Sequence, residues 1–79
     1  MTIKPAHCRA ARGLLDWTRQ DLARAAGVGA PAVSDFERGI RVPHDRTVAA
    51  ITRALEDAGV IFIHGDQPGV KAVKSNPRL

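Results

Sequence analysis

Residues 18–39 constrain this chain most, because they hold two helical patterns that are each too short to stand alone. In the first pattern Leu22 and Ala26 lie four residues apart, and in the second Val33 and Phe36 lie three apart. Isolated helices of about nine residues are unstable in water. The two segments must therefore be held by packing against each other and against the rest of the chain.

Four positions in this segment set how the two helices meet. Ala23 provides the small side chain needed where two short helices cross closely, and Gly27 suits a turn that requires a positive φ. Val33 and Phe36 face inward one turn apart and leave the opposite face of the second helix free for a partner. This spacing predicts a helix-turn-helix over residues 18–38, the arrangement in which the second helix enters the major groove of DNA.

Local start signals predict where these two helices begin. Thr18 followed by Asp21 is a variant capping box, and Trp17 is placed to pack on Leu22 as a hydrophobic staple. We prefer this packing role for Trp17 over stacking on a base. Gly29 is a permitted N-cap for the second helix of the motif.

Two further helices complete the expected fold. Pro5 suits the first turn of a helix over residues 5–15. Asp45 can cap another helix over residues 46–58, with Gly59 as its stop. Because 79 residues suffice for one domain only, these segments predict a single all-α bundle of four helices.

The hydrophobic period changes after the fourth helix. Residues 60–64 are β-branched and aromatic, residues 65–68 have the composition of a turn, and residues 69–74 can form a return strand. A lone two-stranded hairpin is only marginally stable in water. Its first strand is apolar on both faces and does not alternate between apolar and polar residues, so solvent cannot satisfy one side. We therefore expect a second copy of the chain to cover the hairpin. The expected organisation is a DNA-binding domain, a dimerisation hairpin and a frayed tail: residues 1–59, 60–74 and 75–79.

Composition narrows the class of partner. Twelve Lys and Arg residues against eight Asp and Glu give a net charge of +4, which favours a polyanionic partner. Cys8 is the only cysteine, so a disulfide within the chain is excluded and a reducing, cytoplasmic location is expected. The longest apolar run, residues 60–63, is far too short to cross a bilayer, so we expect no membrane partner.

No catalytic or metal-binding pattern accompanies these features. His7 and Cys8 are adjacent, so on a helix they point about a hundred degrees apart and make a poor metal pair. Cys8 also lacks the glycine-rich oxyanion loop and the Cys/His/Asn signature of a catalytic thiol. We therefore expect neither an enzyme nor a cofactor or metal site. Arg9, Arg24 and Arg53 are interpreted as solubilising surface charges.

The longest recognisable motif lies in the same segment. It reads TRQDLARAAGVG over residues 18–29, followed by VSDFERG over residues 33–39 and then Pro43. With this run in register across four expected helices, the chain resembles the Cro/repressor helix-turn-helix family, also called the xenobiotic-response-element (XRE) family. The resemblance covers about residues 6 to 58. It implies a compact bundle of four or five helices that binds operator DNA, usually as a dimer.

The resemblance also implies roles for individual residues. Positions that match DNA-backbone contacts of the family flank the second helix of the motif: Thr18, Arg19, Arg38 and Arg41. Positions that match its base-facing residues lie on that helix: Ala30, Pro31, Ser34 and Asp35. Arg12 and Glu37 match a charged pair that ties the first helix to the end of the third, and we interpret this pair as structural.

The base-facing positions depart from the family pattern, which favours Gln, Arg, Asn or Lys. Alanine can contact a thymine methyl group, serine can bond several bases, and Asp35 can accept from cytosine N4 but repels phosphate. These side chains are therefore expected to contribute little direct base readout, and DNA shape is expected to contribute more of the sequence specificity. Two other functions stay open: the antitoxin of a toxin–antitoxin pair, with the hairpin contacting a toxin protein, and a protein-interaction adaptor that does not bind DNA.

Overall fold

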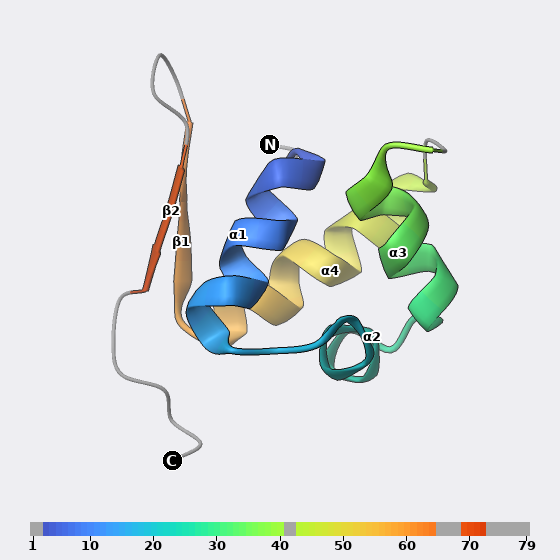
Figure 1. Ribbon diagram of the computed structural model, residues 1–79, viewed down its shortest axis with the longest axis horizontal. Coiled ribbons are helices and arrows are strands. Elements are labelled where there is room, and N and C mark those ends of the chain that lie inside the picture. The colour runs from blue at the N-terminus through green and yellow to red at the C-terminus, as the bar shows by residue number, and fades with distance from the viewer. Residues whose placement is uncertain (1–2, 41–42, 65–68, 73–79) are drawn as a thin grey trace.

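Four α-helices precede a two-stranded antiparallel hairpin in the structure, a computed structural model that describes residues 3–40, 43–64 and 69–72 (Figure 1). The elements are α1 (Pro5–Leu15), α2 (Arg19–Ala26), α3 (Ala30–Arg38), α4 (Asp45–Asp57), β1 (Val60–Ile63) and β2 (Gly69–Ala72). This architecture confirms the predicted all-α bundle with a C-terminal hairpin. Within the described residues, no helix is both long and apolar enough to cross a membrane.

The turn between α2 and α3 is built by the signals that the sequence predicted. The Thr18 hydroxyl oxygen accepts a hydrogen bond from the backbone N–H of Asp21 at 3.0 Å. In return, the Asp21 carboxylate accepts one from the backbone N–H of Thr18 at 2.9 Å. Gly27 then ends α2 with a φ of 72°, a left-handed conformation that strains residues with a side chain. Gly29 is the N-cap of α3. The capping box and the glycine together fix the direction in which α3 leaves.

The core lies among the four helices, and β1 completes it. Leu22, Ile51 and Leu55 are fully buried at its centre. Helix α2 packs against both α3 and α4, and Ala23 is buried as expected for a close helix crossing. Trp17 is half-buried against this core, which fits the packing role predicted for it. The inner face of α3 is thus held firmly by the rest of the bundle.

Helix α4 begins one residue earlier than the sequence predicts. His44 is its N-cap and Asp45 is its first helical residue, so the prediction that Asp45 caps the helix is wrong. The physical reason is that the His44 carbonyl already accepts from the backbone N–H groups of Thr47 and Val48. Asp45 nevertheless stands in the first turn, where its negative charge interacts favourably with the helix dipole.

The hairpin has one covered face and one free face. Phe62 pairs opposite Val70, and both pack against the core, with β2 lying along α1. Ile61 and Ile63 on β1 alternate with these inward residues and are 42% and 40% exposed. The predicted turn, the end of the predicted return strand and the tail lie outside the described residues: 65–68, 73–74 and 75–79.

Candidate nucleic-acid interface

A single buried carboxylate organises the face formed by α1, α2 and α3. Glu37, near the end of α3, is 1% exposed. Arg12 on α1 donates two hydrogen bonds to it, from Nε to Oε2 at 2.6 Å and from Nη2 to Oε1 at 2.8 Å. Arg19 on α2 donates from Nε to Oε1 at 3.2 Å, and the Cys8 thiol donates to Oε2 at 3.1 Å. The carboxylate therefore joins three helices through one acceptor group.

This environment sets the protonation of both Glu37 and Cys8. Burial raises the pKa of the Glu37 carboxyl, but hydrogen bonds from Arg12, Cys8 and Arg19 outweigh burial and hold the pKa below its ordinary value. Burial and the hydrogen bond to Glu37 raise the pKa of the Cys8 thiol far above its ordinary value. Cys8 therefore stays protonated and acts as a hydrogen-bond donor. It is not in the thiolate form that an effective nucleophile requires.

Arg9 reaches Glu37 as well, through the main chain. Its Nη1 donates to the carbonyl oxygen of Glu37 at the end of α3, where helix carbonyls lack partners within the helix. The interpretation of Arg9 as a solubilising charge was incomplete, and the missed signal was its spacing. Arg9 stands three residues before Arg12, so both side chains project from one side of α1. By contrast, Arg24 is highly exposed and pairs with its neighbour on α2, Asp21, at 3.7 Å.

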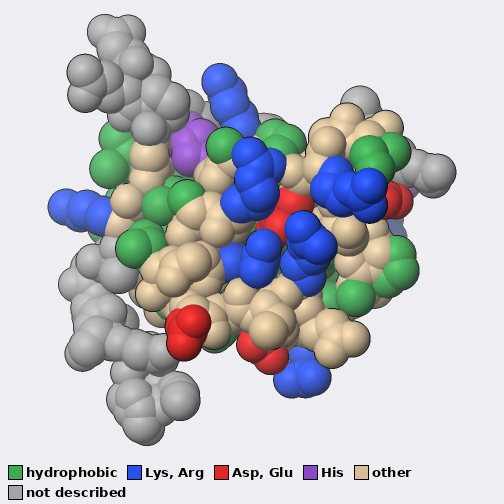
Figure 2. Space-filling model, viewed as in Figure 1, with side chains coloured by type: hydrophobic (Ala, Val, Ile, Leu, Met, Phe, Trp, Pro, Cys, Tyr) green, Lys and Arg blue, Asp and Glu red, His purple; other side chains and the backbone are tan. Residues whose placement is uncertain are grey.

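Basic side chains gather on the face where α1, α2 and α3 meet, as Figure 2 shows. Arg12 and Arg19 contact the carboxylate of Glu37, and Arg9 contacts its carbonyl oxygen. This arginine cluster of three cations and one carboxylate carries two net positive charges. A shallow hollow beside it, at the N-terminal end of α2, is lined by Arg12, Trp17, Thr18, Arg19 and Gln20. Unpaired N–H groups at a helix start attract anions, so this face is suited to phosphate groups.

The residues predicted to face DNA bases lie along α3. Pro31 is exposed, while Ala30, Ser34 and Asp35 are half-buried. The opposite side of the helix carries the buried side chains of Val33, Phe36 and Glu37. Arg38, predicted to contact the DNA backbone, is exposed at the end of α3, one residue after Glu37. Arg41, predicted to have the same role, lies outside the described residues.

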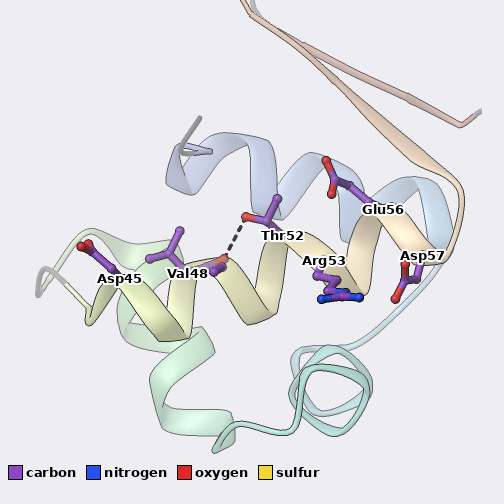
Figure 3. Close-up of a pocket in the computed structure, with 7 residues that line it drawn as sticks. Asp45, Val48, Thr52, Arg53, Glu56 and Asp57 are labelled. Carbon is purple, nitrogen blue, oxygen red and sulfur yellow. Dashed lines mark hydrogen bonds between the residues drawn. The ribbon is translucent and has the colours of Figure 1, made fainter.

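A second concave surface runs along α4 and has a different chemical character. This groove, of about 550 Å³, is lined by Asp45, Val48, Ala49, Thr52, Arg53, Glu56 and Asp57 (Figure 3). Three of these side chains are acidic and one is basic, so the groove repels phosphate. It shares no residue with the arginine cluster. Within residues 3–40, 43–64 and 69–72, no group of three or more His, Cys, Asp and Glu is placed to hold a metal ion.

Comparison with known proteins assigns the fold to a family. A family profile described as helix-turn-helix matches residues 9–56, which include the arginine cluster and all of α3. The chain belongs to the XRE-type helix-turn-helix family. Over 50 residues it is also 44% identical to proteins of Mycobacterium bovis and Mycobacterium tuberculosis, which are named uncharacterized HTH-type transcriptional regulators. That match covers 63% of this chain but spans only 20% of the length of each relative.

Proposed function

We propose that this helix-turn-helix protein binds double-stranded DNA and regulates transcription, with α3 lying in the major groove. The observation that carries the proposal is the arginine cluster around Glu37, which joins α1 and α2 to the end of α3. Membership in the helix-turn-helix family supports it, as do the names of the mycobacterial relatives. In this docking geometry the positive charges meet the phosphates that flank the groove.

The DNA-backbone contacts in this proposal come from both sides of α3. Arg19 uses one N–H for Glu37, and its side chain is 47% exposed, so its other donors are free for a phosphate. Thr18 accepts from Asp21 but keeps its hydroxyl hydrogen available for donation. Arg38 and Arg41 extend the contacts at the other end of the helix. These interactions position the protein without reading sequence.

Sequence readout in this proposal is the task of Ala30, Pro31, Ser34 and Asp35. The first two offer apolar contact to thymine methyl groups, and Ser34 and Asp35 supply a hydroxyl and a carboxylate for base edges. Because these side chains are short, DNA shape contributes a large share of the discrimination.

We further propose that the protein works as a homodimer joined through the hairpin. The exposed side chains of Ile61 and Ile63 give β1 an apolar outer face, which a second copy would cover. A two-fold dimer would place two copies of α3 about 34–36 Å apart, in successive major grooves. Replacing both isoleucines by lysine should yield a monomer in sedimentation. The same change at Ile40, which is 58% exposed but distant in sequence from the hairpin, is the control and should leave the dimer intact.

Selection of bound sequences from random duplex DNA tests the proposal as a whole. We expect binding that weakens steeply with salt and a palindromic consensus whose half-sites are about one helical turn apart. A consensus without a palindrome would contradict the dimer but not DNA binding. Failure to bind any duplex at low salt would contradict the proposed function and favour a protein-interaction adaptor.

A further inference from the structure

We propose that Arg9 is an additional DNA-backbone residue, which binds a phosphate beside Arg38 while it holds the end of α3 in place. This inference rests on the proposed DNA binding and adds to that interface a residue from α1. It assigns Arg9 a role that its position in the sequence, among scattered surface arginines, does not suggest.

The position of the Arg9 guanidinium supports this role. Its Nη1 donates to the Glu37 carbonyl, and the peptide bond of that carbonyl leads directly to Arg38. The next backbone N–H groups, those of Gly39 and Ile40, bond instead to the carbonyls of Phe36 and Asp35. Arg9 therefore donates to a carbonyl oxygen that those two N–H groups leave free. A cation is favourable at this C-terminal end of the helix because of the helix dipole. Its charge lies beside the peptide group that joins Glu37 to Arg38.

The charge of Arg9 is also the least neutralised in the arginine cluster. Arg12 and Arg19 both pair with the carboxylate of Glu37, at 2.6 and 3.2 Å. Arg9 contacts only a neutral carbonyl and has no carboxylate partner within 4.0 Å among the described residues. A guanidinium has several N–H donors in a planar fork, and this side chain is exposed. The donors not used by Glu37 can therefore bind a phosphate in bidentate fashion.

A merely structural role would give a different result in solution. If Arg9 only caps α3, its loss lowers stability and weakens DNA binding by the same factor at every salt concentration. If it also neutralises a phosphate, its loss reduces the number of counterions released on binding. The slope of log Kd against log salt concentration therefore separates the two roles.

The experiment compares full-length Arg9→Ala, Arg9→Gln and Arg9→Lys proteins with wild type on one mixed-sequence duplex. Fluorescence anisotropy gives Kd from about 50 to about 200 mM potassium chloride, and thermal melts check that each variant is folded. The control is Arg53→Ala, because Arg53 is exposed on α4 in the acidic groove (Figure 3). We expect Arg9→Ala and Arg9→Gln to lower the slope by about 0.9, whereas Arg9→Lys and the control keep the wild-type slope.

Three results would overturn the inference. They are an unchanged slope in a folded Arg9→Gln protein, an equal slope for the Gln and Lys variants, and a slope reduced as much by the Arg53 control. If Arg9→Ala fails to fold, the Gln and Lys variants still decide. Wild-type protein that does not bind the duplex would instead refute the proposed function itself, so the two failures are distinguishable.

Discussion

Glu37→Gln is the substitution that tests the organisation of this molecule most directly. It keeps the shape of the side chain but removes the charge that receives two hydrogen bonds from Arg12 and one each from Arg19 and Cys8. It also places an amide NH₂ group, which is a donor, among donors. Removing one partner of a buried ion pair destabilises a protein by about 3–5 kcal/mol.

The structure places the expected loss near the lower end of this range. The Arg12 side chain is 18% exposed, so water can recover part of its solvation. Arg19 is 47% exposed and adds little, as surface ion pairs do. We therefore expect a loss of about 3 kcal/mol. At about 4–8 °C per kcal/mol for a chain of this size, Tm should fall by about 12 °C or more.

Thermal unfolding followed by circular dichroism measures this loss. The control is Glu56→Gln, because Glu56 is an exposed glutamate on α4 and its replacement should change stability by less than about 0.5 kcal/mol. A fall in Tm below about 4 °C for Glu37→Gln, corresponding to less than about 1 kcal/mol, would refute the view that this carboxylate ties the helices together.

The effect of Glu37→Gln should also depend on pH in a definite direction. The folded-state pKa of Glu37 lies below its value in the unfolded chain, about 4.3, so the folded state favours the ionised form. The stabilisation is therefore fully present above about pH 4.3 and is lost as the pH falls through the lowered folded-state pKa. The stability difference between wild type and Glu37→Gln should narrow on acidification. A constant difference would mean that Glu37 acts by its shape and not by its charge.

Three further predictions concern the proposed DNA interface and the helix crossing beneath it. Arg19→Ala and Arg38→Ala should each weaken binding to all sequences alike and lower the salt slope by about 0.9, as measured by anisotropy titrations; two unchanged slopes would exclude the proposed docking. Ser34→Ala and Asp35→Ala should change the preferred base at one or two positions and weaken binding to a matched site by about 1–3 kcal/mol. Selection from random DNA measures this preference, and an unaltered consensus would mean that neither side chain reads bases. Ala23→Leu should overpack the crossing of α2 with its neighbours and lower the free energy of unfolding, measured by denaturant titration, by about 1–3 kcal/mol. A variant as stable as wild type would show that the helices cross less closely.

Much of the fold was predictable because its signals are local. The capping box of Thr18 and Asp21 and the left-handed Gly27 act within a few residues, so they define α2 and its turn without knowledge of the tertiary structure. The cap of α4 was mispredicted for the same reason. His44 and Asp45 are neighbours, and only the path of the backbone decides which of them ends up outside the helix.

The arginine cluster was only partly predictable, because its contacts depend on how α1 is rotated against α3. The resemblance to the family implied the pairing of Arg12 with Glu37, which the structure places at 2.6 Å. It did not imply the Cys8 thiol as a further donor or the contact of Arg9 with the main chain of α3. Both lie on a helix whose composition alone does not show which residues face α3.

The two sides of α3 impose separate constraints on how this protein can change. Val33, Phe36 and Glu37 are buried against the other helices, whereas Pro31 is exposed and Ser34 has only partial cover. Exchange of side chains on the outer side leaves the packed side untouched, so under the proposed docking the target sequence can change without loss of the fold. The inner side allows no such freedom, since one of its members is a carboxylate shared by three helices. Retargeting by design should therefore vary the outer positions together and hold the inner ones fixed.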